Sequence, residues 1–244
     1  MKTHYCNFSD LNYKPHQDYL IKHVKENQIF DNTFAYSKEW LTTTDFYKEN
    51  KKILDYERLC GYALWKPYVI LETLKKADYG DIVVYMDCGD VPVHKEINDV
   101  IKKYMFYNDQ YFITTVNQNR EYTKRDCFVL MNCDSEYYWN SLQMEDGFLS
   151  FKKTDFNIEL VEEWMKYCSD ERIITDMPNT CGLENFSEFK DHRHDQSIIS
   201  LLQLKHELPT NNFVRHYIRF NVLEHVKGVD HSNGVAKWKN GSRV

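Results

Sequence analysis

Residues 81–93, DIVVYMDCGDVPV, contain the stretch that decides the fold. Its centre, Ile-Val-Val-Tyr-Met, is a short apolar run rich in β-branched side chains, which is typical of a strand buried on both faces. Strands of this kind occur in sheets that helices cover on both sides. We therefore predict a strand over 81–87 within an α/β fold, with Asp87 at the carboxyl end of the strand, where open α/β sheets bind their ligands.

The rest of the chain alternates short apolar runs with amphipathic stretches, as α/β folds do. In residues 64–74, Leu64, Tyr68, Leu71 and Leu74 recur at helical spacing. A proline in the first turn of a helix suits this start. By the same reasoning we predict strands at 2–8, 110–116 and 127–131 and helices at 15–27, 158–167 and 195–206.

Composition limits the classes of function. The 244 residues contain no strong linker, so we expect a single domain over 1–244. A net charge of −6 argues against nucleic acid as a partner. Seven cysteines without a CxxC pair predict neither a disulfide framework nor a zinc site. Without a signal sequence or a run of about 18 apolar residues, we expect a cytoplasmic protein, free or peripheral to a membrane.

The turn after the predicted strand 81–87 carries two acids, Asp87 and Asp90, on either side of Cys-Gly. Two carboxylates there could converge on Mn²⁺ or Mg²⁺, which would neutralise a diphosphate leaving group. Two alternatives stay open. Asp90 could simply stabilise the turn while Asp87 ends the strand, or the acids could serve a phosphatase or phosphotransferase of the aspartyl type.

A second group of polar residues lies near the end of the chain in DHSNGVAKW, residues 230–238, with the spacing HxxGxxKxW. A neutral His231 could complete a metal shell, and Gly234 would let the backbone approach a phosphate. Lys237 could supply a charge for a departing diphosphate. The alternative is an ordinary polar tail with a turn at Asn-Gly.

In these blocks the sequence resembles glycosyltransferase family 8, whose tail reads HxxGxxKPW; the proline is missing here. The resemblance implies a GT-A (Rossmann-like) nucleotide-sugar-binding domain with a mixed central sheet flanked by helices. FSDLNY, residues 8–13, is similar to the family's first strand and turn, which implies that Asp10 and Tyr13 bind uracil. YMDCGDVPV is similar to the family's DxD strand, with one more residue between the acids.

Two further blocks extend the resemblance. YYWNSLQMEDGFLSFKK, residues 137–153, is similar to the segment that lines the donor sugar, which implies Asn140 or Gln143. HDQSIIS, residues 194–200, resembles the DQDxLN motif, which implies Asp195 and Gln196. An acid there could bind the donor sugar, stabilise an oxocarbenium-like transition state or deprotonate the acceptor. It could also be only a helix cap.

A second resemblance covers residues 57–90. ERLCGYALWKPYVILETL followed by GDIVVYMDCGD is similar to bacterial and viral polysaccharide glycosyltransferases with RGxGYWxWKP and a later YLDAG. Lys66, beside the free N–H groups of a helix start, would form an anion site for the donor diphosphate. The family 8 comparison implies that Lys66 or Arg58 contacts the donor. Alternatively, Lys66 is a solvated helix end.

Together these features predict transfer of a sugar from a nucleotide-sugar donor, a UDP-sugar, to a hydroxyl of a glycan acceptor. Retention of configuration is implied by the family 8 resemblance alone. The alternatives are a metal-dependent phosphotransferase or hydrolase and a non-catalytic carbohydrate-binding protein. We expect loops 28–56 and 169–194 to choose the acceptor. The expected metal ligands are Asp87, Asp90 and His231; the donor-binding residues are Asp10, Tyr13, Arg58, Lys66, Gly234 and Lys237; and the catalytic residues are Asp195, Gln196 and Gln143.

Overall fold

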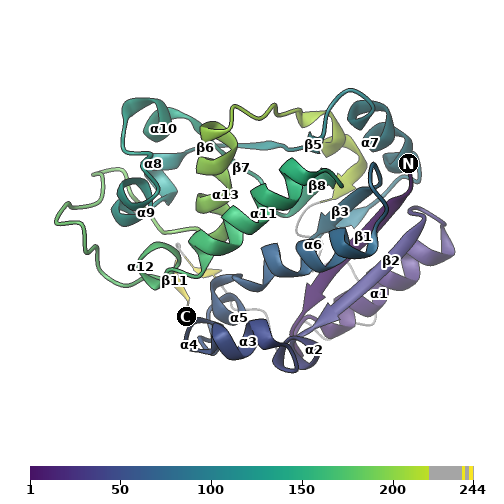
Figure 1. The fold of residues 1–244 in the computed structure, drawn as a ribbon, viewed down its shortest axis with the longest axis horizontal. Helices are drawn as coiled ribbons and strands as arrows, with labels where there is room; N and C mark the ends of the chain where they lie inside the picture. The colour runs from purple at the N-terminus through teal and green to yellow at the C-terminus, as the bar shows by residue number, and fades with distance from the viewer. Residues whose placement is uncertain (220–237, 240–241, 244) are drawn as a thin grey trace.

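The strand predicted over 81–87 lies in the middle of a five-stranded sheet in the computed structural model, which describes residues 1–219, 238–239 and 242–243 (Figure 1). One strand, β8, runs opposite to the other four, so the sheet is mixed. The order across the sheet is β2 (Asn32–Ser37), β1 (Thr3–Ser9), β3 (Ile82–Met86), β8 (Phe148–Lys152) and β5 (Gln110–Tyr111).

Alternate side chains of β1 and β3 enter two different cores, one on each face of the sheet. Tyr5 and Val84 belong to the core that contains α1 (Lys14–Glu26) and α7 (Ile97–Met105). Cys6 and Val83 belong to the larger core on the other face, which holds the helices that cross the front of the sheet in Figure 1. These are α6 (Trp65–Lys76), α11 (Asp155–Cys168) and α13 (His194–Lys205).

The chain reverses direction across the sheet at β1. From β1 it passes through α1 to β2 on one side, and it later returns through α6 to β3 on the other side. Because β1 is parallel to both neighbours, the carboxyl ends of β1 and β3 lie together at this switch point. Such switch points form the ligand crevice of open α/β sheets. Asp10 and Asp87 immediately follow these two strand ends.

Shorter elements surround the sheet. The remaining strands form two-stranded pairs: β4 (Val91–Pro92) with β9 (Ile218–Arg219), β6 (Thr114–Gln118) with β7 (Leu142–Met144), and β10 (Trp238–Lys239) with β11 (Ser242–Arg243). The short helices are α2 (Lys38–Thr42), α3 (Asp45–Glu49), α4 (Lys51–Leu54), α5 (Leu59–Tyr62), α8 (Asn119–Tyr122), α9 (Arg125–Leu130), α10 (Glu136–Asn140), α12 (Glu171–Ile174) and the 3₁₀ helix η1 (Asn212–Tyr217). In the part of the chain that the structure describes, none of the helices is long and apolar enough to cross a membrane.

Most predicted elements are confirmed, but the strand predicted at 127–131 is wrong, because this run lies in helix α9. An apolar run of five residues does not distinguish a buried strand from a buried helix. Distant amides satisfy the free N–H groups at the start of α9: Asn185 Oδ1 accepts from Arg125 N, and Asn179 Oδ1 accepts from Asp126 N. The helix therefore depends on contacts that its own sequence does not contain.

Three other elements differ from the expectation. The strand predicted at 110–116 is divided into β5 and β6. Strand β2 lies inside the expected loop 28–56, and β8 and α7 were not predicted. Strand β8 pairs with β3 over its whole length, so it forms the neighbour of the central strand on the side away from β1.

A left-handed turn precedes α6. Five consecutive residues, from Leu59 to Ala63, have positive φ, between 48° and 92°. L-residues other than glycine adopt this conformation at a cost, and runs of it are rare. The turn ends where α6 begins, and the Trp65 indole N–H donates to the carbonyl of Leu59 at 3.0 Å. The turn therefore fixes the direction in which the first residues of α6 point.

Candidate active site

The ammonium group of Lys66 is the centre of a buried cluster of charges. Its Nζ lies 2.5 Å from Oδ2 of Asp146, 3.3 Å from Oδ2 of Asp195 and 3.4 Å from Oδ1 of Asp87. Only 3% of Lys66 is exposed. The four residues come from the start of α6, the end of β3, the turn between β7 and β8 and the start of α13. We call them the Lys66 cluster.

The Lys66 cluster holds three carboxyl groups and one lysine. Burial alone would lower the pKa of Lys66, but Asp146, Asp195 and Asp87 raise it well above its ordinary value, so the ammonium is charged. Burial raises the pKa of Asp195 well above its ordinary value, and Asp146 raises it further, against the opposing effect of Lys66. Burial also raises the pKa of Asp87. Burial therefore favours the protonated form of Asp195 more than an exposed position would.

Asp87 and Asp90 meet at Gly147. The Asp87 N–H donates to the Gly147 carbonyl at 2.9 Å, and the Asp90 N–H donates to the Asp87 carbonyl at 3.0 Å. A β-carbon on Gly147 would lie 2.5 Å from Oδ2 of Asp90 and 3.6 Å from Oδ2 of Asp87. The turn therefore brings the carboxylates of Asp87 and Asp90 to the same position beside Gly147, although they are separated by one more residue than in a DxD motif. Any residue other than glycine at position 147 would place its β-carbon there.

The two oxygens of Asp87 have different surroundings. Oδ1 accepts a hydrogen bond from the hydroxyl group of Tyr85 and faces Lys66. Oδ2 faces the open side of Gly147 together with Asp90. One oxygen thus fixes the carboxylate, and the other remains directed to the point that Asp90 also faces.

This pair of carboxylates fits a hard divalent cation that is bound together with a diphosphate. Mg²⁺ is commonly held by one or two carboxylates, and substrate phosphates and water complete its shell. Over the residues whose positions are described, no group of three or more His, Cys, Asp or Glu side chains could hold a metal ion. Asp87 and Asp90 therefore fit a cation that a diphosphate also binds better than a cation that protein ligands alone would hold.

The residues predicted to bind uracil lie at the same end of the sheet. Asp10 follows β1, and its Oδ1 accepts a hydrogen bond from the Tyr13 N–H at 3.0 Å. Burial raises the pKa of Tyr13, and the negative charges of Asp10 and Asp87 raise it further. Tyr13 is therefore close enough to Asp87 to feel its charge, while 36% of its surface stays exposed for a ligand.

Gln143 and Gln196 join β7 to α13. Gln143 is fully buried, and its amide donates to Ser197 Oγ at 3.2 Å. Gln196 donates to the Met144 carbonyl at 2.6 Å. Both amides therefore fix the start of α13, and with it Asp195, relative to β7.

Of the remaining predicted residues, Arg58 bonds acids outside the Lys66 cluster, and three lie outside the described part. Arg58 donates to Asp176 Oδ2 at 2.8 Å and to Asp191 Oδ2 at 2.6 Å, both in the loop between α12 and α13. His231, Gly234 and Lys237 lie outside the described residues.

Sequence reasoning did not find Glu145 and Asp146, although it quoted the segment that contains them. Both precede β8, which brings them beside Asp87. Burial raises the pKa of Glu145, and Asp146 raises it further. Arg215 lies 3.5 Å from Glu145 Oε2 and donates to the Thr114 carbonyl at 2.8 Å. The signal was the Glu-Asp-Gly turn before the alternating apolar residues of β8.

No protein-family model and no curated protein sequence matches this chain. Among solved structures, it is similar to a glycosyltransferase involved in the glycosylation of the major capsid of PBCV-1, with 10% identity over 73% of this chain and 72% of the other and a TM-score of 0.42. It is similar to mouse xyloside xylosyltransferase 1, with 9% identity, coverage of 86% and 84% and a TM-score of 0.47. It is also similar to the glycosyltransferase GlyE of Streptococcus pneumoniae TIGR4, with 12% identity, coverage of 86% and 45% and a TM-score of 0.40. None of these likenesses identifies the reaction, so the function has to be argued from the residues of the site.

Proposed function

We propose that the protein is a metal-dependent GT-A glycosyltransferase that moves a sugar from a UDP-sugar to a hydroxyl group of a glycan. The observation that carries this proposal is the meeting of Asp87 and Asp90 over Gly147 at the switch point of the sheet. The motif resemblances in the sequence support the same function. A nucleotide-sugar needs a nucleoside site and a cation site side by side. Asp10 and Tyr13 lie where the nucleoside would bind.

Asp87 and Asp90 would hold Mn²⁺ or Mg²⁺, and the sequence pattern adds His231 as a ligand. The cation would neutralise the charge that develops on the diphosphate. The protein supplies the positions of the two carboxylates, because Tyr85 and Lys66 fix one oxygen of Asp87 and Gly147 leaves the other side open.

Lys66 acts in this proposal through the carboxylates rather than on the diphosphate. Its side chain is 4% exposed, and three carboxyl groups surround its ammonium. The fixed positive charge of Lys66 holds the three carboxyl groups close together, although they would otherwise repel one another. We therefore assign Lys66 as a positioning residue, which differs from the anion-binding role expected from the sequence. Lys237 would remain the lysine that stabilises the leaving UDP.

The transfer itself breaks the bond between the anomeric carbon and the diphosphate oxygen and forms a bond from that carbon to the acceptor oxygen. The acceptor loses its proton, and the departing UDP takes the bonding electron pair. Burial favours the protonated form of Asp195, so we assign it to position the donor sugar by hydrogen bonding. The acceptor proton can pass to the departing diphosphate, which carries the bonding electron pair. Gln143 and Gln196 would hold α13 in place.

The partners follow from the same chemistry. The donor is a nucleotide-sugar and the acceptor is a glycan, whether polysaccharide, lipopolysaccharide or the glycan of a glycoprotein, and no nucleic acid is involved. All seven cysteines are free thiols, which supports a reducing compartment and hence the cytoplasm or the cytoplasmic surface of a membrane.

Donor hydrolysis, assayed over UDP-, GDP-, TDP- and CMP-sugars with and without EDTA, tests the proposal. We expect turnover of a UDP-sugar that EDTA abolishes and Mn²⁺ restores, and a rise in Tm with UDP and Mn²⁺ together. Turnover that persists in EDTA would contradict the cation site. Release of phosphate from simple esters without preference for nucleotide-sugars would indicate a phosphotransferase or hydrolase instead. Stabilisation by glycan alone, without an effect of UDP and Mn²⁺, would indicate a carbohydrate-binding protein.

A further inference from the structure

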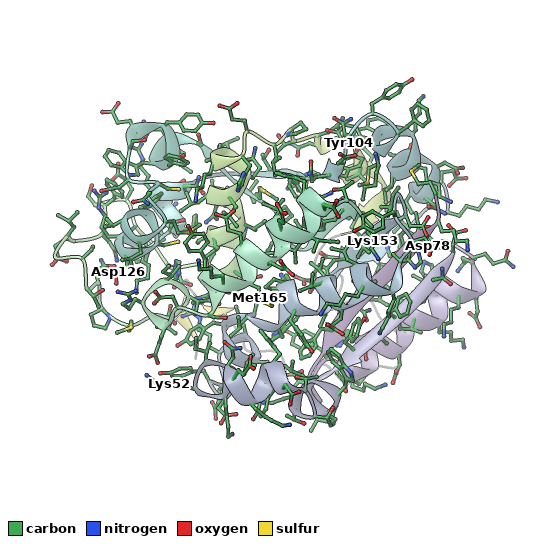
Figure 2. The ribbon with its side chains drawn as sticks, viewed as in Figure 1. Lys52, Asp78, Tyr104, Asp126, Lys153 and Met165 are labelled. Atoms are coloured by element: carbon green, nitrogen blue, oxygen red, sulfur yellow. The ribbon has the colours of Figure 1, made fainter. Side chains whose placement is uncertain are left out.

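The loop between α12 and α13 lies beside α9 at one end of the molecule (Figure 1). Residues of this loop line a cavity of about 270 Å³ together with Arg58 and Lys124. Asp126, labelled in Figure 2, holds this loop: its carboxylate accepts hydrogen bonds from the N–H groups of Thr180 and Cys181 at 2.8 to 2.9 Å. The residues that line the cavity include Arg58, Lys124, Asp176, Phe189, Asp191 and His192. We call it the loop pocket.

The charged groups of the loop pocket balance one another. The Arg58 guanidinium bonds both Asp176 and Asp191. Lys124 donates to the Met177 carbonyl at 2.8 Å, and its side chain is 4% exposed. Two basic side chains thus face two acidic ones. The pocket offers polar groups in several directions but no excess of charge for a phosphate or a carboxylate.

His192 adds no charge to the loop pocket. Its Nε2–H donates to the Ile173 carbonyl at 2.8 Å, and its Nδ1 accepts from the backbone N–H of Lys124 at 3.3 Å. These partners fix a neutral tautomer. Burial also holds the pKa of His192 well below its ordinary value.

His194 presents an acceptor beside this pocket. Its Nδ1–H donates to the Ile174 carbonyl at 2.8 Å, and burial together with Arg58 lowers its pKa to about 3, so Nε2 carries a lone pair. This Nε2 lies 3.8 Å from Oδ1 of Asp176, which lines the loop pocket. The residues that the structure describes provide no hydrogen-bond donor to Nε2. Nε2 is itself buried, so a ligand in the loop pocket would meet Asp176 rather than His194.

The loop pocket adjoins the Lys66 cluster. His192 lines the pocket, its ring lies 5.1 Å from that of His194, and Asp195 is the next residue of α13. The charge of Asp146 also reaches His194. Only the segment from His192 to Asp195 would therefore separate a ligand in the pocket from the proposed site of sugar transfer.

We propose that the loop pocket binds one sugar unit of a neutral glycan acceptor. This inference rests on the proposed function. A sugar offers hydroxyl donors for Asp176 and Asp191 and a C–H face that packs on the ring of Phe189. The volume lies just below the usual range for small-molecule sites, about 300–1,000 Å³, so it suits no more than one sugar unit. The balance of charge selects a neutral acceptor over a phosphorylated one.

The test compares Phe189→Ala and Asp176→Asn with wild type, and Phe106→Ala serves as the matched control. Phe106 follows α7, is 71% exposed and does not line the loop pocket. We expect both pocket variants to raise the acceptor KM about tenfold, while the donor KM and acceptor-independent donor hydrolysis stay unchanged. Phe106→Ala should leave all three quantities unchanged. An unchanged acceptor KM in both pocket variants would overturn the proposal.

A binding measurement separates failure of this inference from failure of the proposed function. Neutral and phosphorylated oligosaccharides are titrated, without nucleotide, into wild type and Phe189→Ala, and the Tm is recorded. We expect neutral oligosaccharides to raise the Tm of wild type and to lose this effect in the variant. A preference for the phosphorylated compounds, or an equal effect on both proteins, would overturn the loop pocket. Absence of donor hydrolysis in wild type would instead contradict the transferase function.

Discussion

Lys66 Nζ and Asp146 Oδ2 lie 2.5 Å apart inside the protein, although the two residues are 80 positions apart in the chain. The pair joins the start of α6 to the turn before β8, and Asp87 and Asp195 lie at the same ammonium. A buried ion pair of this kind contributes little net stability when complete but costs much when one partner is removed. The main effect of the ion pair between Lys66 and Asp146 is to fix the positions of the residues that it joins.

Lys66→Met should therefore destabilise the protein strongly, because it leaves the buried carboxyl group of Asp195 and the partly buried ones of Asp87 and Asp146 without a cation. We expect the free energy of unfolding to fall by about 3–5 kcal/mol, measured by urea denaturation at neutral pH. Lys48→Met is the control, because Lys48 forms an exposed ion pair with Asp45 at 2.8 Å. That variant should leave stability unchanged. A loss for Lys66→Met as small as that of the control would contradict the central position of Lys66.

Asp195→Asn should stabilise the fold at neutral pH. Burial raises the pKa of Asp195 in the folded state, so the folded protein binds a proton that the unfolded chain releases above about pH 4. The stability that this proton contributes is present below that pH and is lost as the pH rises through the raised pKa. Asparagine keeps a hydrogen-bond donor and does not ionise. The advantage of the variant in free energy of unfolding should therefore grow from about pH 4 upward.

Asp170→Asn provides a control of opposite sign. The hydrogen bond from Arg172 lowers the pKa of Asp170, so its contribution to stability is present at neutral pH and is lost as the pH falls. The variant should be less stable than wild type at neutral pH, and the difference should shrink in acid. Urea denaturation from about pH 2 to about pH 8 measures both series, because the Asp170 contribution is lost below about pH 4. If wild type gained stability with rising pH relative to Asp195→Asn, Asp195 would be an ordinary ionised carboxylate.

The sequence predicted the part of the fold that local patterns determine. The β-branched run before Asp87 identified β3, because burial on both faces of a sheet leaves a continuous apolar run, and the helical spacing of apolar residues around Lys66 identified α6. The run at Cys127 was assigned to a strand because it has no such period, and contacts from Asn179 and Asn185 determine its helical form.

The candidate site was predictable only where a residue ends a predicted strand. Asp10 and Asp87 follow parallel strands, so their proximity follows from the topology. Asp146 reaches Lys66 because β8 pairs antiparallel with β3, and such long-range pairing leaves no local trace. Gln143 and Arg58 have residue types suited to binding a substrate, but the first is fully buried and the second is held by two acids. Residue type alone does not indicate burial.

Gly147→Ala should weaken metal binding without unfolding the protein. The added methyl group would meet Asp90 Oδ2 at 2.5 Å, so the carboxylate must move away from Asp87. Displacing a metal ligand in this way is expected to lower Mn²⁺ affinity about 10- to 100-fold, measured as free Mn²⁺ by electron paramagnetic resonance in the presence of UDP. Gly182→Ala is the control, because it has φ of +79° and no atom near the new methyl group. It should lose some stability and keep its Mn²⁺ affinity. Equal affinities in both variants would show that Asp90 does not reach the cation.

Gly61→Ala should lower the free energy of unfolding more than Gly80→Ala does, because the left-handed turn before α6 contacts α4. The two glycines have φ of +92° and +85°, so alanine carries the same conformational cost, about 1–2 kcal/mol, at either position. A methyl group at Gly61 would also lie 2.6 Å from Cα of Leu54, which is backbone of α4, whereas Gly80 has no atom within 4 Å. This overpacking should cost about 1–3 kcal/mol more in urea denaturation. Since the turn also aims Lys66, we expect Gly61→Ala, but not Gly80→Ala, to slow donor turnover. Equal losses of stability in the two variants would mean that the turn can move away from α4, and the positioning of Lys66 would then need another cause.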